Sequence, residues 1–344
     1  MSIFQAATIA AAMRAVFALG RGDKMLIDQL GTDGMRGVLD RCPLLLRIAI
    51  GEGDLDEAPG FKLDEELGGT AVGVRCELPH VLVAVDPIDG TQLAAKNKPG
   101  AIAVLAGAIS GEGTLWRAPE CYAEKRCVGP ELAHALKEAA EGGKKFTYGD
   151  WTLDPALPLI GQPMEALILF AREKLKKVIV VEYLDRERNQ YIVDAIRRTG
   201  AIASPIDAGD IGSAVRVVQP HHNVDIAAGS GGGPEGVIAA VIAKCSGGYF
   251  EQRPYFSDSE EDRCLRQSLI DAGIDPDKTY VMEELAGGHV FFSCTALTHA
   301  FIPGVNFTNH DAMKTNTIIG RSRTGTHYDI AGAHGKPPPQ PEIP

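Results

Sequence analysis

The stretch that decides the fold is Val85-Asp86-Pro87-Ile88-Asp89-Gly90-Thr91. It closes an apolar run, residues 80–86, that is typical of a buried strand. Pro87 has no amide hydrogen and fixes φ, so the sequence predicts that the strand ends at Asp86 and that the chain turns there. Gly90 leaves the backbone free to present Thr91. The sequence therefore predicts two carboxylates and a hydroxyl at the end of one strand.

These side chains are suited to a divalent cation. Hard cations bind oxygen ligands, which include carboxylates and a backbone carbonyl such as that of Ile88. A plain surface turn is the alternative, because Asp-Pro and Asp-Gly pairs are common in turns. A surface turn rarely opens directly from a buried strand, so the pattern favours a cation site.

The rest of the chain alternates between short apolar strands and helical patterns. The predicted strands are residues 80–86, 101–107, 177–183, 224–229 and 289–295. The predicted helices are residues 23–40, 187–199, 234–245 and 257–272, with an Ala-rich amphipathic helix before Gly20. Strands and helices mixed in this order predict a layered α/β or α+β architecture.

A change in character within residues 128–162 marks the expected boundary between two parts. This segment combines a pair of glycines, a pair of lysines and a Pro-containing stretch. We therefore expect an N-terminal α+β metal-binding part at residues 1–160 and a C-terminal α/β substrate-binding part at residues 161–330. The Pro-rich end, residues 331–344, is expected to be a mobile tail.

The composition limits the classes of protein that fit. The chain has 344 residues, 45% of them hydrophobic, which suffices for one large domain or two closely packed ones. A net charge of -11 argues against nucleic acid or an anionic membrane as a partner. The sequence shows neither a membrane-spanning apolar run nor the basic start of a signal peptide. Seven cysteines without a Cys-x-x-Cys pair predict reduced, mostly buried thiols in a cytoplasmic protein.

Two further acidic segments lie where a helix or strand begins or ends. Asp23 is the expected N-cap of a helix in which Lys24 and Asp28 share one face, where an exposed ion pair is the alternative. Glu52 follows an apolar run and has a glycine on each side, so a ligand could approach its backbone closely. An acidic surface turn would look similar at Glu52.

A glycine-rich segment, residues 229–236, leads into a predicted helix. Backbone amides before a helix N-terminus can hold an anion, so residues 231–233 are candidates for contact with a phosphate or a sugar. Glu235 lies in the first helical turn, where it could stabilise the helix dipole or bind a metal. The segment lacks the Gly-Lys-Ser/Thr ending of a nucleotide-binding P-loop.

Two arginines, Arg186 and Arg188, follow the predicted strand 177–183. An arginine at a strand end can hold a phosphate by two parallel hydrogen bonds, although a solvated charged turn is equally common. Nearby, Asp207 and Asp210 repeat the pattern of acidic residues at a strand end.

Residues 86–91 resemble the Asp-Pro-Ile/Leu-Asp-Gly-Thr/Ser signature of the metal-dependent, lithium-sensitive phosphatase superfamily. Other segments, in family order from about Gly22 to Arg323, resemble class II fructose-1,6-bisphosphatases, some of which also act on sedoheptulose-1,7-bisphosphate. These segments are Gly22-Asp23-Lys24, Ile50-Gly51-Glu52-Gly53, Asp56-Glu57-Ala58-Pro59, Ala118-Pro119 with Tyr122 and Glu124-Lys125, and Gly231 to Gly236. The resemblance implies an α+β fold, specifically the layered α/β/α/β sugar-phosphatase sandwich.

The resemblance also implies a set of site residues. The implied metal ligands, for Mg²⁺ or Mn²⁺, are Asp28, Glu52, Asp86, Asp89 and Glu235. The implied catalytic residues are Thr91, beside the attacking water, with Glu52, Asp86 and Asp89. The implied contacts to a sugar bisphosphate are Lys24, Asp89, Gly90, Thr91, Tyr122, Arg186, Arg188, Asp210 and Gly232. We also expect a homo-oligomer.

The sequence departs from the class II pattern at several of these positions. Asp89 replaces a usual Glu, Gln92 a usual Arg, and Arg186 a usual Lys. The usual Asp-Gly-Asp occurs here as Ala208-Gly209-Asp210, so one sugar-hydroxyl contact differs.

The expected reaction is hydrolysis of the 1-phosphate of fructose-1,6-bisphosphate, as in gluconeogenesis or the Calvin cycle. Clustered cations would neutralise the phosphoryl oxygens and the mutual repulsion of the carboxylates, and Thr91 would pass a water proton to Glu52, Asp86 or Asp89. One alternative is an inositol-phosphate or nucleotide-bisphosphate phosphatase of the same superfamily. Another is a non-catalytic metabolite-binding homologue, against which four intact residues argue: Asp86, Asp89, Thr91 and Glu235.

Overall fold

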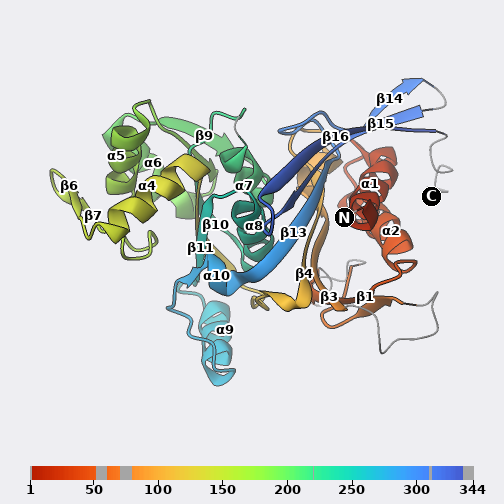
Figure 1. Ribbon diagram of the computed structural model, residues 1–344, viewed down its shortest axis with the longest axis horizontal. Coiled ribbons are helices and arrows are strands. Elements are labelled where there is room, and N and C mark those ends of the chain that lie inside the picture. The colour runs from red at the N-terminus through yellow and green to blue at the C-terminus, as the bar shows by residue number, and fades with distance from the viewer. Residues whose placement is uncertain (1, 52–59, 70–79, 220, 310–311, 336–344) are drawn as a thin grey trace. The chain divides into compact units, whose positions relative to one another are not determined.

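The structure is a computed structural model that describes residues 2–51, 60–69, 80–219, 221–309 and 312–335 (Figure 1). The chain forms two compact units. Unit 1 comprises residues 1–117 and 286–344, and unit 2 comprises residues 118–285.

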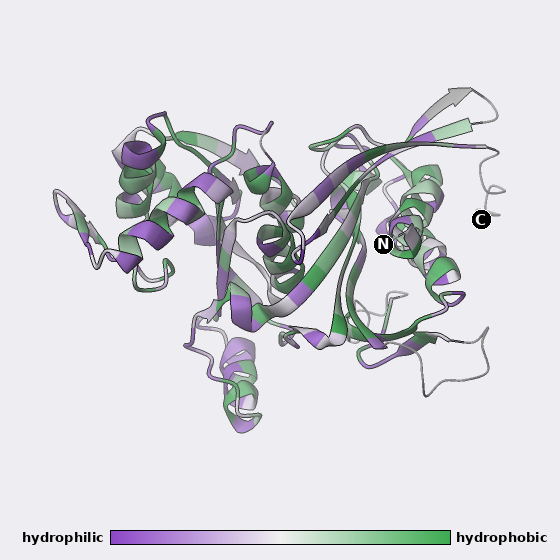
Figure 2. Cartoon of the chain, in the orientation of Figure 1, coloured by the Kyte–Doolittle hydropathy of each residue, from purple (hydrophilic) through white to green (hydrophobic). Residues whose placement is uncertain are grey.

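Unit 1 contains, in the described part of the chain, a sheet of eight strands in the order β14-β15-β13-β4-β3-β1-β2, with β16 paired to β15. The strands are β1 (Leu45–Ile50), β2 (Glu66–Gly68), β3 (His80–Asp89), β4 (Ile102–Leu115), β13 (Ala286–Ala296), β14 (Asn306–Asn309), β15 (Ala312–Arg321) and β16 (Thr326–His334). β1 and β3 are parallel and the other pairs are antiparallel. β3 and β4 are hydrophobic along most of their length (Figure 2), as strands covered on both faces must be.

Two long helices pack with this sheet. The helices of unit 1 are α1 (Ser2–Ala15), the 3-10 turn η1 (Val16–Ala18), α2 (Lys24–Leu39) and α3 (Thr91–Ala95). Thr8 of α1 makes hydroxyl contacts of 2.8 Å with Ser293 and 2.9 Å with Thr295 on β13. α2 lies close to α1, because a Cβ at Gly34 would collide with the Ala10 carbonyl. The predicted N-terminal helix is confirmed, but it is buried over most of its surface instead of amphipathic.

Unit 2 contains a second sheet, ordered β12-β11-β5-β10-β8-β9 in the described residues. Its strands are β5 (Tyr122–Val128), β8 (Val180–Leu184), β9 (Ile202–Ile206), β10 (Ile226–Gly232), β11 (Tyr249–Pro254) and β12 (Tyr280–Val281), and a separate hairpin is formed by β6 (Phe146–Tyr148) and β7 (Trp151–Leu153). β8 is parallel to β10 and β9, whereas β5 is antiparallel to β10 and β11.

Helices cover both faces of this second sheet. The helices of unit 2 are α4 (Pro130–Glu141), α5 (Met164–Leu175), the 3-10 turn η3 (Glu187–Asn189), α6 (Gln190–Thr199), α7 (Asp210–Val218), α8 (Gly233–Cys245), α9 (Glu260–Asp271) and α10 (Met282–Leu285). On one face Val128 packs with α4, α5 and α6 around Phe170, whose full burial contributes roughly 1.5–3 kcal/mol. On the other face Cys127 lies with Ala214 of α7 and Ala239 of α8.

The α+β sandwich class is confirmed, and each predicted strand overlaps an observed one. The observed units differ from the predicted division at residue 160, because their boundaries fall at residues 117 and 285. The Gly- and Pro-containing segment expected to be the boundary instead contains α4 and the β6–β7 hairpin, both inside unit 2. Of the expected mobile tail, residues 331–334 belong to β16, and residues 336–344 lie outside the described residues.

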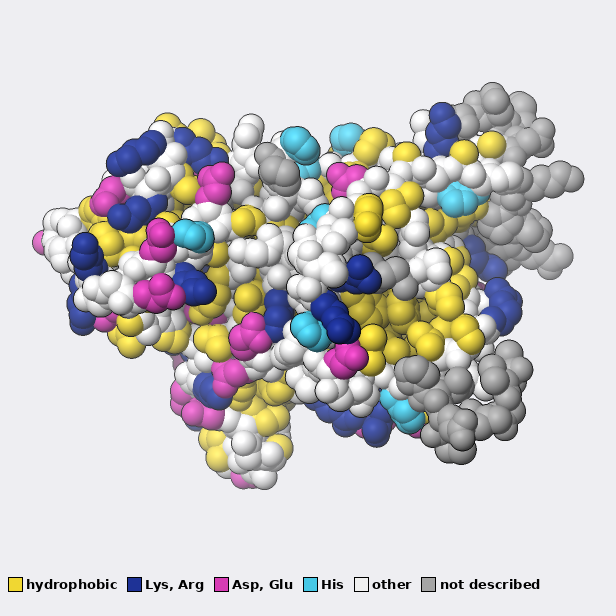
Figure 3. All heavy atoms as spheres, in the orientation of Figure 1, with side chains coloured by type: hydrophobic (Ala, Val, Ile, Leu, Met, Phe, Trp, Pro, Cys, Tyr) yellow, Lys and Arg dark blue, Asp and Glu magenta, His cyan; other side chains and the backbone are white. Residues whose placement is uncertain are grey.

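The described residues also bear on the predicted partners. No helix among them is long and apolar enough to cross a membrane. Lys and Arg side chains are interspersed with Asp and Glu on the face drawn in Figure 3. No disulfide links the described cysteines, and burial raises the pKa of Cys121 to about 11 and that of Cys127 to about 12. Thiols with such pKa values stay protonated at neutral pH, as expected for structural cysteines.

Candidate active site

The carboxylates of unit 1 lie at the end of β3. Asp86 and Asp89 have exposed fractions of 3% and 6%. The prediction that the strand ends at Asp86 is wrong, because β3 continues through Pro87 to Asp89. The register with β4 shifts between the two aspartates, and an irregular ladder tolerates a proline without an amide donor. The turn comes at Gly90, whose φ of 80° favours glycine.

Thr91 contacts a carboxylate from another element. Its Oγ1 lies 2.7 Å from Asp28 Oδ1 on α2 and 2.9 Å from the Ile88 carbonyl oxygen. A hydroxyl has one proton, so Thr91 donates to one of these oxygens at a time. The expected acceptors were Glu52, Asp86 and Asp89, whereas this hydrogen bond leads to Asp28.

A close approach of α2 to β3 explains this pairing. A Cβ at Gly31 would lie 2.7 Å from Cγ1 of Ile88, so only glycine fits without displacing the helix. Asp28 is three residues earlier and therefore on the same face of α2. Gly31 thus sets the distance at which Asp28 meets Thr91.

The two aspartates of β3 also act on one buried thiol. Asp86 pairs with Val104 on β4, and Val104 pairs with Cys294 on β13, so the three residues share one row across the sheet. Burial, together with the negative charges of Asp89 and Asp86, raises the pKa of Cys294 well above its ordinary value.

The predicted metal ligands are only partly described. Glu52 lies outside the described residues. In the part of the chain that is described, no group of three or more His, Cys, Asp or Glu side chains is arranged to hold a metal ion. Lys24 is exposed at the start of α2, and the predicted N-cap is confirmed, since Asp23 accepts a 3.0 Å bond from the Leu26 amide. The metal-ligand set stays a prediction.

In unit 2, Arg188 lies at the junction of β8 and α6. Its Nε donates to Ser230 Oγ at 2.6 Å, and its Nη2 donates to the Ser230 carbonyl at 3.0 Å. Its guanidinium carbon lies 4.6 Å from the ring centre of Tyr122. Asn189 holds Ser230 in turn, accepting a 3.1 Å bond from its amide. Two predicted substrate contacts, Arg188 and Tyr122, are therefore neighbours.

Arg186 points to different partners. Its guanidinium donates to the carbonyls of Asp185 at 2.8 Å and Asp207 at 2.7 Å, and the side chain is exposed. These bonds fix the loop before α7 to the end of β8. The remaining donors of Arg186 are open to a phosphate.

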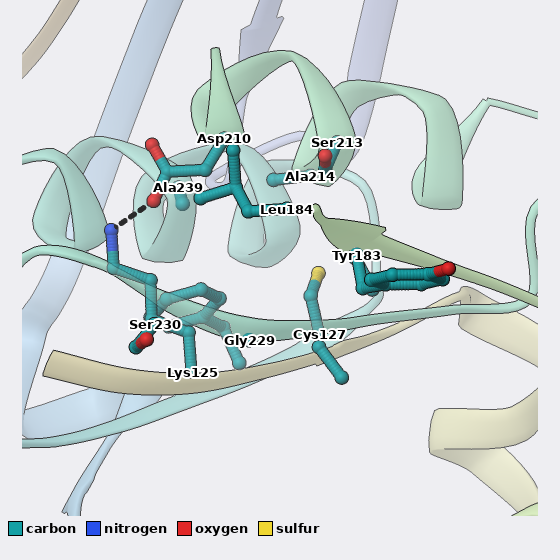
Figure 4. A pocket seen from close by; sticks show the side chains of 13 residues that line it. Lys125, Cys127, Tyr183, Leu184, Asp210, Ser213, Ala214, Gly229, Ser230 and Ala239 are labelled. Atoms are coloured by element: carbon teal, nitrogen blue, oxygen red, sulfur yellow. Dashed lines mark hydrogen bonds and ion pairs between the residues drawn. The ribbon is translucent and has the colours of Figure 1, made fainter. Parts of the chain in front are cut away.

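The ammonium group of Lys125 pairs with Asp210, one of the predicted acidic residues of unit 2 (Figure 4). Lys125 Nζ lies 2.5 Å from Asp210 Oδ2, and both side chains are largely buried. Glu235 has one buried oxygen, Oε2, that accepts no hydrogen bond from a described residue. Burial raises the pKa of Glu235; the positive charge of Lys125 opposes this effect, and Asp210 adds to it.

The glycines of residues 231–233 have a different role from the one expected. Gly231 and Gly232 belong to β10 and pair with β5, and the Gly233 amide donates to the Cys121 carbonyl at 2.7 Å. The expected cradle of amides is therefore largely used within the protein. Instead, the missing side chains make room for carboxylates: a Cβ at Gly231 would collide with Asp210, and one at Gly232 with Glu235.

Sequence reasoning missed three residues that organise the candidate site of unit 2. Lys125 belongs to a segment that carried the family resemblance, but a lysine within a strand gives no sign of its partner. Asn189 adjoins Arg188, and Ser230 lies inside the glycine-rich segment. Pairing of β5 with β10 brings Lys125 opposite Gly229 and Glu124 opposite Ser230.

Buried carboxylates beside a Thr–Asp pair in unit 1, and an arginine beside a glycine-rich strand in unit 2, are features expected of the class of metal-dependent phosphatases. Comparison with known families agrees. The family model described as "Bacterial fructose-1,6-bisphosphatase, glpX-encoded" matches residues 2–147 and 153–334. The chain belongs to this family.

Known relatives match over nearly the same length. A protein of Synechococcus sp. (strain JA-3-3Ab) is 33% identical over 354 residues, which cover 96% of this chain and 94% of the relative. A protein of Trichodesmium erythraeum (strain IMS101) is 31% identical over 338 residues, 92% of this chain and 91% of the relative. Both are named D-fructose 1,6-bisphosphatase class 2/sedoheptulose 1,7-bisphosphatase. The class II resemblance is confirmed.

Proposed function

We propose that the protein is a metal-dependent sugar bisphosphatase that hydrolyses the 1-phosphate of fructose-1,6-bisphosphate and of sedoheptulose-1,7-bisphosphate. Water adds to phosphorus, the bond from phosphorus to the sugar oxygen breaks, and a sugar monophosphate and inorganic phosphate result. Two findings support this reaction. The family model matches nearly the whole chain, and the names of the relatives include both bisphosphatase activities. The observation that carries it is the hydrogen bond between Thr91 and Asp28 next to the buried aspartates of β3.

The residues present fit a divalent cation. Asp86 and Asp89 are carboxylates removed from water, and such burial is costly unless a positive charge compensates it. Glu235 has a buried oxygen that accepts no described hydrogen bond. The proposed ligands, which also include Asp28 and Glu52, would all bind through oxygen, as Mg²⁺ and Mn²⁺ prefer. The cations would neutralise phosphoryl charge and lower the pKa of water.

Thr91 and Asp28 are the chain's own means of moving a proton. The Thr91 hydroxyl can accept a hydrogen bond from the attacking water while it donates its proton toward Asp28 Oδ1. Asp28 is fixed by the contact of α2 with Ile88, so the pair keeps its distance without substrate. Thr91 would orient the water, and Asp28 would accept a proton as the water loses its own to Thr91.

The groups of unit 2 are suited to hold the substrate. Arg188 uses two of its five N–H donors on Ser230, and the remaining three can bind the phosphate that is not cleaved. Tyr122 limits the position of this guanidinium from one side. Asp210 and Gly232 would contact sugar hydroxyls, and Lys24, Gly90 and Arg186 complete the proposed substrate contacts.

A turnover panel tests the proposal. Purified protein should release phosphate from fructose-1,6-bisphosphate and sedoheptulose-1,7-bisphosphate with Mg²⁺ or Mn²⁺. Inositol phosphates and nucleotide bisphosphates, the substrates of the alternative, should be hydrolysed much more slowly. Preference for either alternative substrate would refute the proposed specificity, and turnover of none would favour the non-catalytic homologue.

Replacing Arg188 should separate bisphosphate from monophosphate binding. Arg188→Ala should raise KM for fructose-1,6-bisphosphate roughly 10- to 100-fold, the size of one lost charge-assisted contact. KM for fructose-1-phosphate should change little, since that substrate lacks the second phosphate. The measurement is a pair of saturation curves for each variant.

Arg197→Ala is the matched control for this experiment. Arg197 is an arginine on α6 whose side chain is 72% exposed, so its loss should change neither KM. Equal effects of Arg188→Ala on both substrates would contradict the remote-phosphate role.

The homo-oligomer and the cytoplasmic location remain predictions. Light scattering of the purified protein would measure the first, and fractionation of the producing cells the second.

A further inference from the structure

Lys125 is a buried cation that the proposed reaction does not yet use. It lies on β5, one strand away from the glycine-rich end of β10, and its side chain is 9% exposed. A lysine at this depth requires a partner, because a buried ammonium is costly if it is not compensated. Asp210, at the first position of α7, supplies that partner at 2.5 Å.

Two glycines show how tightly this cluster is packed. A Cβ at Gly231 would collide with Asp210 Oδ2 and would lie 3.3 Å from Lys125 Nζ. A Cβ at Gly236 would collide with Gln252 and would lie 3.3 Å from Lys125 Cε. The ammonium is thus confined between the end of β10 and the first turn of α8. The Lys125–Asp210 pair has little room to take up another arrangement.

The pair leaves one oxygen of Asp210 unused by Lys125. Oδ2 contacts the ammonium, whereas the second carboxylate oxygen points away from it in Figure 4. The Asp210 side chain is 19% exposed, so it retains some access to solvent. An aspartate held by one oxygen presents the other in a fixed direction, which suits it to accept a hydrogen bond from a sugar hydroxyl.

We propose that Lys125 is a positioning residue, which orients Asp210 to accept a hydroxyl of the substrate sugar. This inference rests on the proposed function, because it assigns Asp210 to a sugar bisphosphate. It goes further in naming the group that fixes Asp210 and the reason why Gly231 has no side chain. It also bears on the departure at residue 208: with alanine there, more of the sugar recognition depends on Asp210.

A double-mutant cycle tests whether Lys125 acts through Asp210. Lys125→Met and Asp210→Asn should each raise KM for fructose-1,6-bisphosphate roughly 10- to 100-fold, as expected for one charge-assisted hydrogen bond. Their kcat values should fall less than about threefold, because neither group touches the reacting phosphate in this scheme. In the Asp210→Asn background, Lys125→Met should raise KM by less than about threefold further.

Lys137→Met is the matched control, because Lys137 lies on α4 with its side chain 76% exposed and should leave KM unchanged. If Lys125→Met does not fold because Asp210 is left uncompensated, Lys125→Met/Asp210→Asn removes both charges and Asp210→Asn alone still reports on the pair. Lys125→Arg, which keeps the charge, should recover part of the affinity. Calorimetric titration of fructose-1,6-bisphosphate into Thr91→Ala variants should show the same cycle in Kd.

The possible failures are distinguishable. Lack of turnover of any sugar bisphosphate by the wild type would refute the proposed function itself. Normal turnover with an unchanged KM in Lys125→Met would refute only the positioning role. Multiplicative effects of the two substitutions on KM, or a loss confined to kcat, would also overturn it.

Discussion

Thr91→Ala should lower kcat by roughly 10²–10⁴-fold, the range typical of a lost general acid–base group. The Oγ1 atom of Thr91 lies 2.7 Å from Asp28 Oδ1, so alanine removes the hydroxyl that would link this carboxylate to the attacking water. KM should change much less, because the substrate phosphates and hydroxyls have other partners. Initial rates over a range of fructose-1,6-bisphosphate concentrations measure both constants.

Thr91→Ser is the control that isolates the hydroxyl from its methyl group. It should retain kcat to within about tenfold, because serine can make the same hydrogen bond from the start of α3. Asp28→Asn should lower kcat like Thr91→Ala, and the double variant should be little worse than either single one, because groups that act as a unit are non-additive. Wild-type kcat in Thr91→Ala would remove the hydroxyl from the chemistry.

The sequence predicted which side chains lie at the end of β3 better than it predicted their geometry. Residues 80–86 showed a buried strand, and Asp86, Asp89 and Thr91 followed it closely enough for local rules to group them. The expectation that Pro87 ends the strand was wrong, because it considered the strand without its neighbours in the sheet. The register with β4 shifts between Asp86 and Asp89, so the strand continues through this proline. Local sequence patterns do not reveal how β3 aligns with β4.

Contacts between distant segments were the least predictable. Asp28 and Thr91 are brought together by Gly31, whose importance depends on the position of Ile88 in another element. Lys125 on β5 pairs with Asp210 at the start of α7, and this contact also depends on how distant segments pack together. The glycines of β10 were expected to offer free amides to a ligand. The sequence does not reveal that the backbone of this strand pairs with β5.

The departures from the class II pattern can now be placed. Asp89 is buried at the end of β3, and its side chain is shorter by one methylene than the usual glutamate. Arg186 binds the carbonyls of the loop before α7, which a single ammonium would do less completely than a planar guanidinium. Both changes keep the charge of the usual residue. We therefore expect them to alter substrate preference more than the reaction.

Removal of divalent cations should abolish turnover, with at least a 10³-fold loss of kcat expected, since metal assistance supplies several kcal/mol of transition-state stabilisation. The physical reason lies in the burial of Asp86 and Asp89, which are 3% and 6% exposed and carry like charges near one thiol. Phosphate release would be followed after treatment with a chelator, and then after addition of Mg²⁺ or Mn²⁺, which should restore it. Full activity in the chelated protein would refute the metal-dependent mechanism.

Binding of the metal alone gives a second readout that does not depend on turnover. Mn²⁺ added to the chelated wild type should raise its Tm, because a ligand that binds the folded state stabilises it by mass action. Asp86→Asn should weaken this shift, since it removes one negative charge from the donor set but keeps the size of the side chain. Glu138→Gln on α4, whose side chain is 69% exposed, should leave the shift unchanged. An equal rise in Tm for Asp86→Asn and wild type would place the cation elsewhere, because a carboxylate that binds it cannot become an amide without loss of affinity.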